Sequence, residues 1–216
     1  MEIEPNYSEG QIGVIHGNLG SGKSDIALLI AQCDQIAFFQ RYKKRIILLT
    51  NIEGPTTKFI KRFKTDLELL TLFTQHHGPK MVIFDEGGVF ASSKRIMANQ
   101  AVFTEHLVVL IRKFRCSIIF IAQLDSLTLP TVRNLASWSI EKLNKKEALF
   151  EIDGNLGKPF DIPRTSIPFD SHAVAYFEFT LDIDSVFAEI ANLPEKQMLA
   201  RLKKIIQNPI DFQLFD

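Results

Sequence analysis

The chain has 216 residues, which suits one α/β domain with a small appendage, and 46% of them are hydrophobic, including 18 Phe. This composition supports a buried core and excludes an intrinsically disordered chain. The 25 basic residues balance 25 acidic ones, so net charge identifies no nucleic-acid partner, although a neutral chain can still concentrate positive charge locally.

Two cysteines, Cys33 and Cys116, have neither a CxxC spacing nor a neighbouring His cluster. We therefore expect reduced thiols in an intracellular protein. The N-terminus is acidic and polar, so no signal peptide is evident, and no run reaches the ~18 apolar residues that a membrane span needs. These features predict a soluble protein of the cytoplasm, or one associated with a virion if the chain is viral.

Hydrophobic periodicity predicts alternating strands and helices in the first two-thirds of the chain. Buried strands are expected at residues 11–16, 45–50, 80–85 and 117–122, and helices at residues 23–39, 56–75 and 99–114. Strands that are apolar throughout and alternate with helices indicate a mainly parallel central sheet flanked by helices.

The pattern changes after about residue 136, where shorter and more polar runs predict antiparallel strands. These runs are residues 138–143, 147–152 and 160–162. Asp153-Gly154-Asn155 lies between two of them and is a hairpin signal, and residues 182–207 return to helical spacing. We predict a single domain at residues 1–216, with a core at 1–136 and a β-rich extension and C-terminal helix at 137–216.

A glycine-rich loop follows the first predicted strand and precedes the first predicted helix. It matches Gly-x-x-x-x-Gly-Lys-Ser with the residues Gly17, Asn18, Leu19, Gly20, Ser21, Gly22, Lys23 and Ser24. Phosphate oxygens need several converging amide donors, and a tightly wound loop at a helix N-terminus provides them. We expect this loop to bind ATP, with Lys23 reaching the β- and γ-phosphates and Ser24 ligating Mg²⁺. A chance glycine turn is the alternative, which the strand–loop–helix context disfavours.

Two acids, Asp85 and Glu86, end the buried strand at residues 80–85. Asp85 fits a ligand of the Mg²⁺ shell, and Glu86 fits the base that polarises the attacking water. The alternative is a strand that simply ends in solvent-exposed acids. Together with the glycine-rich loop, the pair favours ATP hydrolysis over transfer to a small acceptor, because an acceptor kinase needs no water-activating acid.

Gln123 closes the fourth buried strand. If this strand is adjacent to the loop strand, Gln123 senses the nucleotide and orients water; otherwise it is an ordinary strand-ending glutamine. An arginine often meets the charge that develops on the γ-phosphate, from the same chain or from a neighbouring subunit. Arg133 is the first candidate, and Arg112 and Arg115 come next. Considered singly, each of these arginines fits a solvated surface position better than a catalytic one.

The order of these motifs resembles the FtsK–HerA superfamily of ring-forming P-loop motors, most closely its Zot-like phage proteins and viral genome-packaging ATPases. The likeness covers residues 12–143 and is carried by residues 17–24, 49–54, 83–86 and 112–123. It implies a homo-hexameric ATPase acting on double-stranded DNA, with Gln123 as sensor and a neighbouring subunit's arginine completing each site. It also implies a capsid or virion membrane protein as a partner. Zot-like members usually carry a membrane span after this domain, and none is expected within this chain.

Four functional hypotheses follow. The first is an ATP-driven DNA translocase of viral or mobile-element type, such as a genome-packaging motor. The second is a virion assembly or export ATPase without duplex translocation, which a test for DNA-stimulated ATPase activity separates from the first. A nucleotide or small-molecule kinase ranks lower because no Arg-rich lid segment is evident. A nucleotide-binding regulator without turnover is the fourth.

Overall fold

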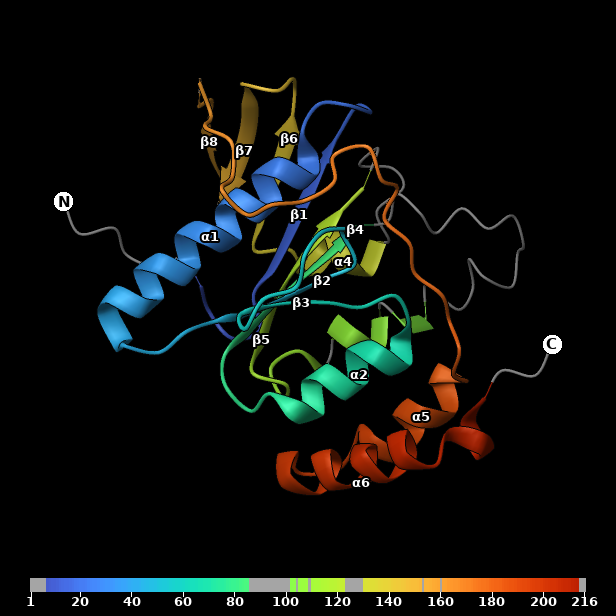
Figure 1. The fold of residues 1–216 in the computed structure, drawn as a ribbon. Coiled ribbons are helices and arrows are strands. Elements are labelled where there is room, and N and C mark those ends of the chain that lie inside the picture. Colours follow the sequence, from blue (N-terminus) through green and yellow to red (C-terminus); the bar gives the residue numbers. More distant parts are fainter. Residues whose placement is uncertain are drawn as a thin grey trace.

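A computed structural model of the chain describes residues 7–85, 102–103, 105–108, 110–122, 130–152, 154–159 and 161–213. Within these residues one sheet has the strand order β3-β2-β4-β5-β1-β6-β7-β8 (Figure 1). The strands are β1 (Ile12–Gly17), β2 (Ile47–Thr50), β3 (Ile60–Arg62), β4 (Lys80–Asp85), β5 (Cys116–Ile121), β6 (Trp138–Lys142), β7 (Ala148–Ile152) and β8 (Asn155–Gly157). The six strands from β3 to β6 are parallel, and β7 and β8 are antiparallel additions, which confirms the predicted fold class.

Helices cover both faces of this sheet (Figure 1). They are α1 (Lys23–Tyr42), α2 (Asp66–Gln75), α4 (Pro130–Leu135), α5 (Ile183–Ile190), α6 (Glu195–Gln207) and a 3₁₀ helix at Pro209–Phe212. Residues 102–103, 105–108 and 110 are also helical, within the helix predicted at 99–114. The predicted C-terminal helix at 182–207 is two helices, because Pro194 lacks the N–H that a continuous helix needs.

Alternate residues of each buried strand pack into two separate cores, as the period of two in a strand requires. Val82 and Phe84 of β4 join the core that contains α2, α5 and α6. Ile83 and Met81 face the opposite side and pack with the apolar residues of α1. A strand buried on both faces has no polar side in its sequence, and this is why these runs were recognisable as parallel strands.

Two predicted elements were wrong. Residues 56–65 are not helical, because β3 pairs in parallel with β2 at this place. Helix α2 begins only after Thr65, whose hydroxyl accepts the Glu68 N–H at 3.1 Å while the Glu68 carboxylate accepts the Lys64 N–H at 2.6 Å. The Thr65 cap sets the helix start, and the Glu68 carboxylate adds a contact one residue before the cap. Residues 161 and 162 are not in a strand, and β8 directly after the Gly154 turn forms the hairpin with β7 instead.

Residues 161–182 form a long crossing segment without helix or paired strand of their own (Figure 1). It begins near the β-hairpin, passes α1 and the loop after β2, and ends beside α2. Asp170 donates its N–H to the Glu53 carbonyl at 3.0 Å, and Glu178 donates to the Lys64 carbonyl at 2.8 Å. Backbone hydrogen bonds therefore attach the segment to the loop after β2 and to the residues just before α2.

The two cysteine thiols differ in accessibility. Cys33 is exposed on α1 and Cys116 is fully buried at the start of β5. Burial raises the pKa of the Cys116 thiol to about 12 and also raises that of Cys33. Since only the thiolate reacts readily, we expect one thiol, Cys33, to react with an aromatic disulfide reagent in the folded protein, faster as pH rises. Both should react in denaturant, and two fast thiols without denaturant would contradict the position of Cys116.

None of the helices in the described part of the chain combines the length and the apolar character that crossing a bilayer requires.

Candidate nucleotide-binding site

The glycine-rich loop joins the carboxyl end of β1 to the first turn of α1. Gly22 precedes the helix with a φ of 91° and has no side chain to cap it. The first backbone N–H groups of α1 can therefore donate hydrogen bonds to a bound anion. Ser21 is 5% exposed, and its hydroxyl is one of three buried side-chain polar atoms without a partner among the described residues. A loop with free amide donors and an unpartnered buried hydroxyl fits a phosphate group.

The loop is held close to the neighbouring strand β6, and this contact requires a glycine at position 17. Gly17 has a φ of 140°, and a Cβ there would lie 2.3 Å from the Lys142 carbonyl oxygen. Gly17 and Lys142 are register partners in the parallel pair β1–β6. The first glycine of the motif therefore serves the packing of the loop against β6 as well as its turn.

Lys23 is folded back over its own loop. Its ammonium group donates to the Gly17 carbonyl at 2.8 Å and to the Asn18 carbonyl at 3.0 Å. Burial lowers the pKa of Lys23, and the Asp85 carboxylate opposes this effect. The positive charge is thus placed over the loop, among the groups that would hold phosphate oxygens.

Ser24 and Asp85 come together although 61 positions separate them. The Ser24 hydroxyl donates to the Asp85 carboxylate at 2.8 Å, across the strand β5 that lies between β1 and β4. A hydroxyl and a carboxylate are oxygen ligands of the kind that Mg²⁺ takes. No group of three or more His, Cys, Asp or Glu is gathered elsewhere in the described residues. A cation held by Ser24 and Asp85 would complete its shell with phosphate and water oxygens.

Asn51 was not among the predicted site residues, yet it positions Asp85. It follows β2, is 3% exposed, donates its side-chain amide to the Asp85 carbonyl at 2.8 Å and accepts the Asp85 N–H at 2.8 Å. This two-point contact orients the end of β4. The available signal was its place in residues 49–54, a segment that carried the family resemblance.

Replacing Asn51 by Ala should therefore disturb the cation site without touching the loop. We expect a loss of about tenfold or more in Mg²⁺-dependent nucleotide affinity, in line with the effect of removing a partner that orients a metal ligand. Titration calorimetry with and without Mg²⁺ measures this difference. Asn208, exposed at the end of α6, provides the matched control. An equal loss with and without Mg²⁺ would contradict a role at Asp85.

Three of the predicted catalytic side chains cannot be placed. Glu86 and Gln123 lie outside the described residues, and Arg133 belongs to α4 but its side chain is outside them as well. The prediction for Gln123 required the preceding strand to lie beside the loop strand, and β5 does pair with β1, as well as with β4; the position of Gln123 itself stays a prediction. Ala122, the residue before it, donates its N–H to the Ile15 carbonyl at 2.9 Å.

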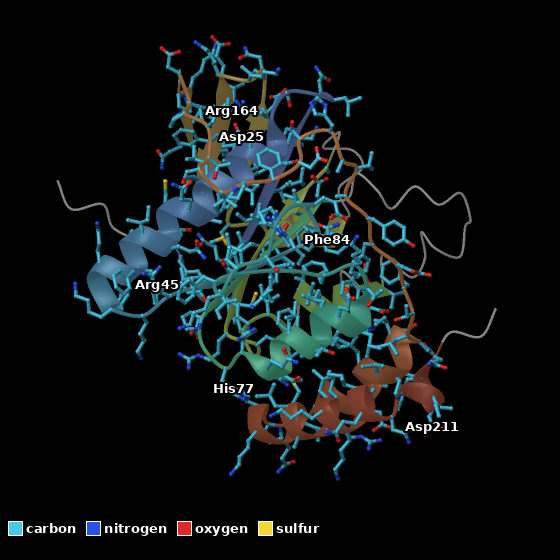
Figure 2. The ribbon with its side chains drawn as sticks, viewed as in Figure 1. Asp25, Arg45, His77, Phe84, Arg164 and Asp211 are labelled. Carbon is cyan, nitrogen blue, oxygen red and sulfur yellow. The ribbon has the colours of Figure 1, made fainter. Side chains whose placement is uncertain are left out.

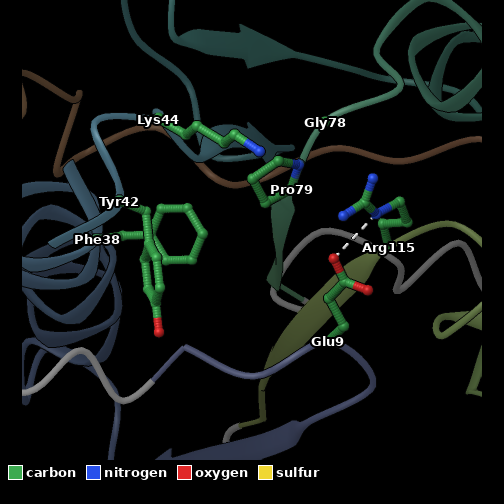
Figure 3. Close-up of a pocket in the computed structure, with 7 residues that line it drawn as sticks. All are labelled: Glu9, Phe38, Tyr42, Lys44, Gly78, Pro79 and Arg115. Atoms are coloured by element: carbon green, nitrogen blue, oxygen red, sulfur yellow. Dashed lines mark hydrogen bonds and ion pairs between the residues drawn. The ribbon is translucent and has the colours of Figure 1, made fainter.

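A hollow of about 350 Å³ lies at the amino ends of the central strands, whereas the glycine-rich loop follows the carboxyl end of β1 (Figure 3). Arg115 there pairs with Glu9 at 3.0 Å, beside the aromatic rings of Phe38 and Tyr42 from α1. Glu9 precedes β1 and Arg115 precedes β5, whereas the phosphate loop follows the other end of β1. This hollow is therefore separate from the glycine-rich loop, and Arg115 does not reach the loop of its own chain.

Solved structures of several ATPases are similar to the chain in fold. The genome packaging NTPase B204 of Sulfolobus turreted icosahedral virus 2 matches 73% of this chain and 100% of its own, with 12% identity and a TM-score of 0.48. The N-terminal domain of zonular occludens toxin from Neisseria meningitidis matches 78% and 100%, with 16% identity and a TM-score of 0.45. The cytoplasmic domain of the type VII secretion ATPase EccC from Thermomonospora curvata matches 76% of this chain and 26% of its own, with 14% identity and a TM-score of 0.48.

At these identities the likeness concerns the fold alone. No protein-family model and no curated protein matches the sequence.

Proposed function

We propose that the chain binds Mg-ATP through residues 17–24 and hydrolyses it. The observation that carries this proposal is the 2.8 Å contact between Ser24 and Asp85, made at the uncapped N-terminus of α1. The contact joins a phosphate-binding loop to a carboxylate strand that is remote in sequence. Such an arrangement serves a metal-bound polyphosphate, whereas a simple glycine turn needs no carboxylate at this point.

The site residues divide the work by their chemistry. The amides of residues 17–24 and the Lys23 ammonium bind the phosphate oxygens, and Ser24 and Asp85 hold Mg²⁺, which offsets phosphate charge when bound. Glu86 accepts a proton from the attacking water, and Gln123 orients that water. Arg133, in the same chain or reaching a neighbouring subunit, meets the charge that develops on the γ-phosphate.

The work driven by this hydrolysis is, in our proposal, translocation of double-stranded DNA by a ring of identical subunits, as in genome packaging. The support is the order of the motifs, together with the position of the Gln123 strand between the loop strand and the carboxylate strand. A capsid or virion membrane protein would be the partner that receives the DNA.

The test is the ATPase rate with and without double-stranded DNA, on material sized by light scattering. A ring-sized particle whose rate rises with DNA supports the motor. An ATPase rate that does not change with DNA would favour a virion assembly or export ATPase. A protein that stays monomeric, with an ATPase rate unchanged by DNA at all concentrations, would contradict the motor.

A Glu86→Gln variant tests the hydrolysis step in the same assay. We expect it to bind ATP and to lose about 100-fold in turnover, the scale of a positioned general base. Glu151→Gln, at an exposed position on β7, is the matched control. Unchanged turnover in Glu86→Gln would point to a nucleotide-binding protein without the proposed chemistry.

A further inference from the structure

The two flanks of the glycine-rich loop differ in chemistry. On the side of β5 and β4 lies the Ser24–Asp85 contact, where the proposed metal binds. On the other side lie β6 and the turn that follows it. A Cβ on Gly22 would be 3.8 Å from both the Lys142 Cε and the Lys145 Cα, so the end of β6 and the turn after it lie close to the loop. The β6 flank is thus the side of the loop away from the proposed metal.

Asp25 places a negative charge on this second flank. It directly follows Ser24 in the first turn of α1, and its side chain is 17% exposed. A carboxylate suits a helix N-terminus, but it repels a phosphate bound there unless cations accompany it. Lys142 is one such cation. The pKa of Lys142 is lowered, because burial lowers it more than the nearby carboxylates of Asp25 and Glu147 raise it.

Arg164 is the second cation at this carboxylate and belongs to the crossing segment (Figure 2). Its Nε lies 3.7 Å from the Asp25 carboxylate, and its side chain is 80% exposed. A contact of this length at such exposure contributes little to stability. The guanidinium can therefore leave Asp25 for a stronger partner at little cost.

The backbone that carries Arg164 is fixed. Thr165 donates its N–H to Asp25 at 3.1 Å and its hydroxyl to Gln32 at 3.0 Å, and Ser166 donates its N–H to Gln32 at 2.8 Å. Ile167 is buried in the core beside α1. An exposed arginine thus stands on an anchored main chain next to the phosphate loop, a combination that limits the entropy lost when the side chain binds.

We propose that Arg164 is a nucleotide-binding residue, whose guanidinium binds the α-phosphate of a nucleoside di- or triphosphate held by residues 17–24. The inference rests on the proposed function of that loop. A guanidinium offers two parallel N–H donors to a phosphate and forms stronger hydrogen bonds with it than a neutral donor does. Asp25 holds the arginine near the site before the nucleotide arrives, and the nearby Lys142, whose ammonium group donates to the Asn144 and Glu147 carbonyls, adds positive charge on the same flank.

The test compares the affinities of ATP and ADP, measured by titration calorimetry with Mg²⁺. Arg164→Gln should weaken both about tenfold, the scale of one charged hydrogen bond, and by the same factor, because both nucleotides carry the α-phosphate. The nucleotide affinities of Arg164→Lys should lie between those of the wild type and those of Arg164→Gln, since lysine keeps the charge without the paired donors. Arg201→Gln removes another surface ion pair, Arg201–Glu189 at 2.6 Å on α6 and α5, whose two side chains are each 40% exposed, and it should leave both affinities unchanged.

Hydrogen exchange gives a readout that does not depend on turnover. ADP should slow exchange of the amides at residues 164–167 in the wild-type protein and much less in Arg164→Gln. Wild-type affinities in both Arg164 variants would overturn this inference and leave the proposed function intact. A loss confined to ATP would also overturn it, because it places the arginine at the γ-phosphate. Absence of nucleotide binding by the wild-type protein would instead refute the proposed function itself.

Discussion

Replacing Lys23 by Ala is expected to lower ATP turnover by about 100-fold or more, the scale of removing one donor that stabilises developing negative charge. The ammonium group now contacts the carbonyls of Gly17 and Asn18, so the substitution removes a charge from the middle of the phosphate loop. Lys80 and Lys142 also donate to backbone carbonyls, but these carbonyls lie outside the loop. We therefore expect little compensation from a neighbour.

Turnover and nucleotide affinity should be measured together for this variant. Lys203→Ala, exposed on α6, is the matched control and should match the wild type. Thermal unfolding should also be close to that of the wild type, because the two hydrogen bonds of Lys23 are partly exposed. A Lys23→Ala protein with normal affinity and normal turnover would refute the assignment of residues 17–24.

Replacing Asp66 by Ala is expected to lower the free energy of unfolding by roughly 3 kcal/mol, because several buried donors lose their acceptor at once. Asp66 is fully buried at the start of α2. Its carboxylate accepts the Thr180 hydroxyl at 2.6 Å, the Thr180 N–H at 3.0 Å, the Leu181 N–H at 3.1 Å and the Leu67 N–H at 2.7 Å. These contacts attach the end of the crossing segment to α2.

For a chain of this size the loss corresponds to a fall of roughly 6–12 °C in Tm, which calorimetry or circular dichroism measures. Asp184→Ala is the control, because Asp184 is exposed on α5 and its pair with His106 at 2.9 Å should contribute little. Equal Tm values for Asp66→Ala and the wild type would show that the end of the crossing segment is not held by this carboxylate.

Local sequence was sufficient for the glycine-rich loop and for the buried strands around it. The pattern at residues 17–24 needs only its own residues and the flanking strand and helix to be recognised. The strands β1, β4 and β5 are buried on both faces, so their sequences are apolar throughout and stand out from the rest. Asp85, which ends β4, was recognisable for the same reason.

Short edge elements were not recognisable in this way. β3 has the three residues Ile60-Lys61-Arg62 and is a strand because β2 lies beside it. Its own residues favour a helix about as well, and tertiary pairing decides between the two. The same holds for β8, which exists through its pairing with β7.

The sequence alone named the glycine-rich loop and Asp85, but it named neither Asn51 nor Arg164, and the contacts of all these residues depend on the tertiary structure. The Ser24–Asp85 contact requires β5 between β1 and β4, the Asn51–Asp85 contact requires β2 beside β4, and Arg164 reaches α1 only because the crossing segment is anchored there. A sequence pattern reports the preferences of residues that are close along the chain. Which remote segments meet is set by how their apolar faces pack and by which buried polar groups find partners, and both depend on the whole folded chain.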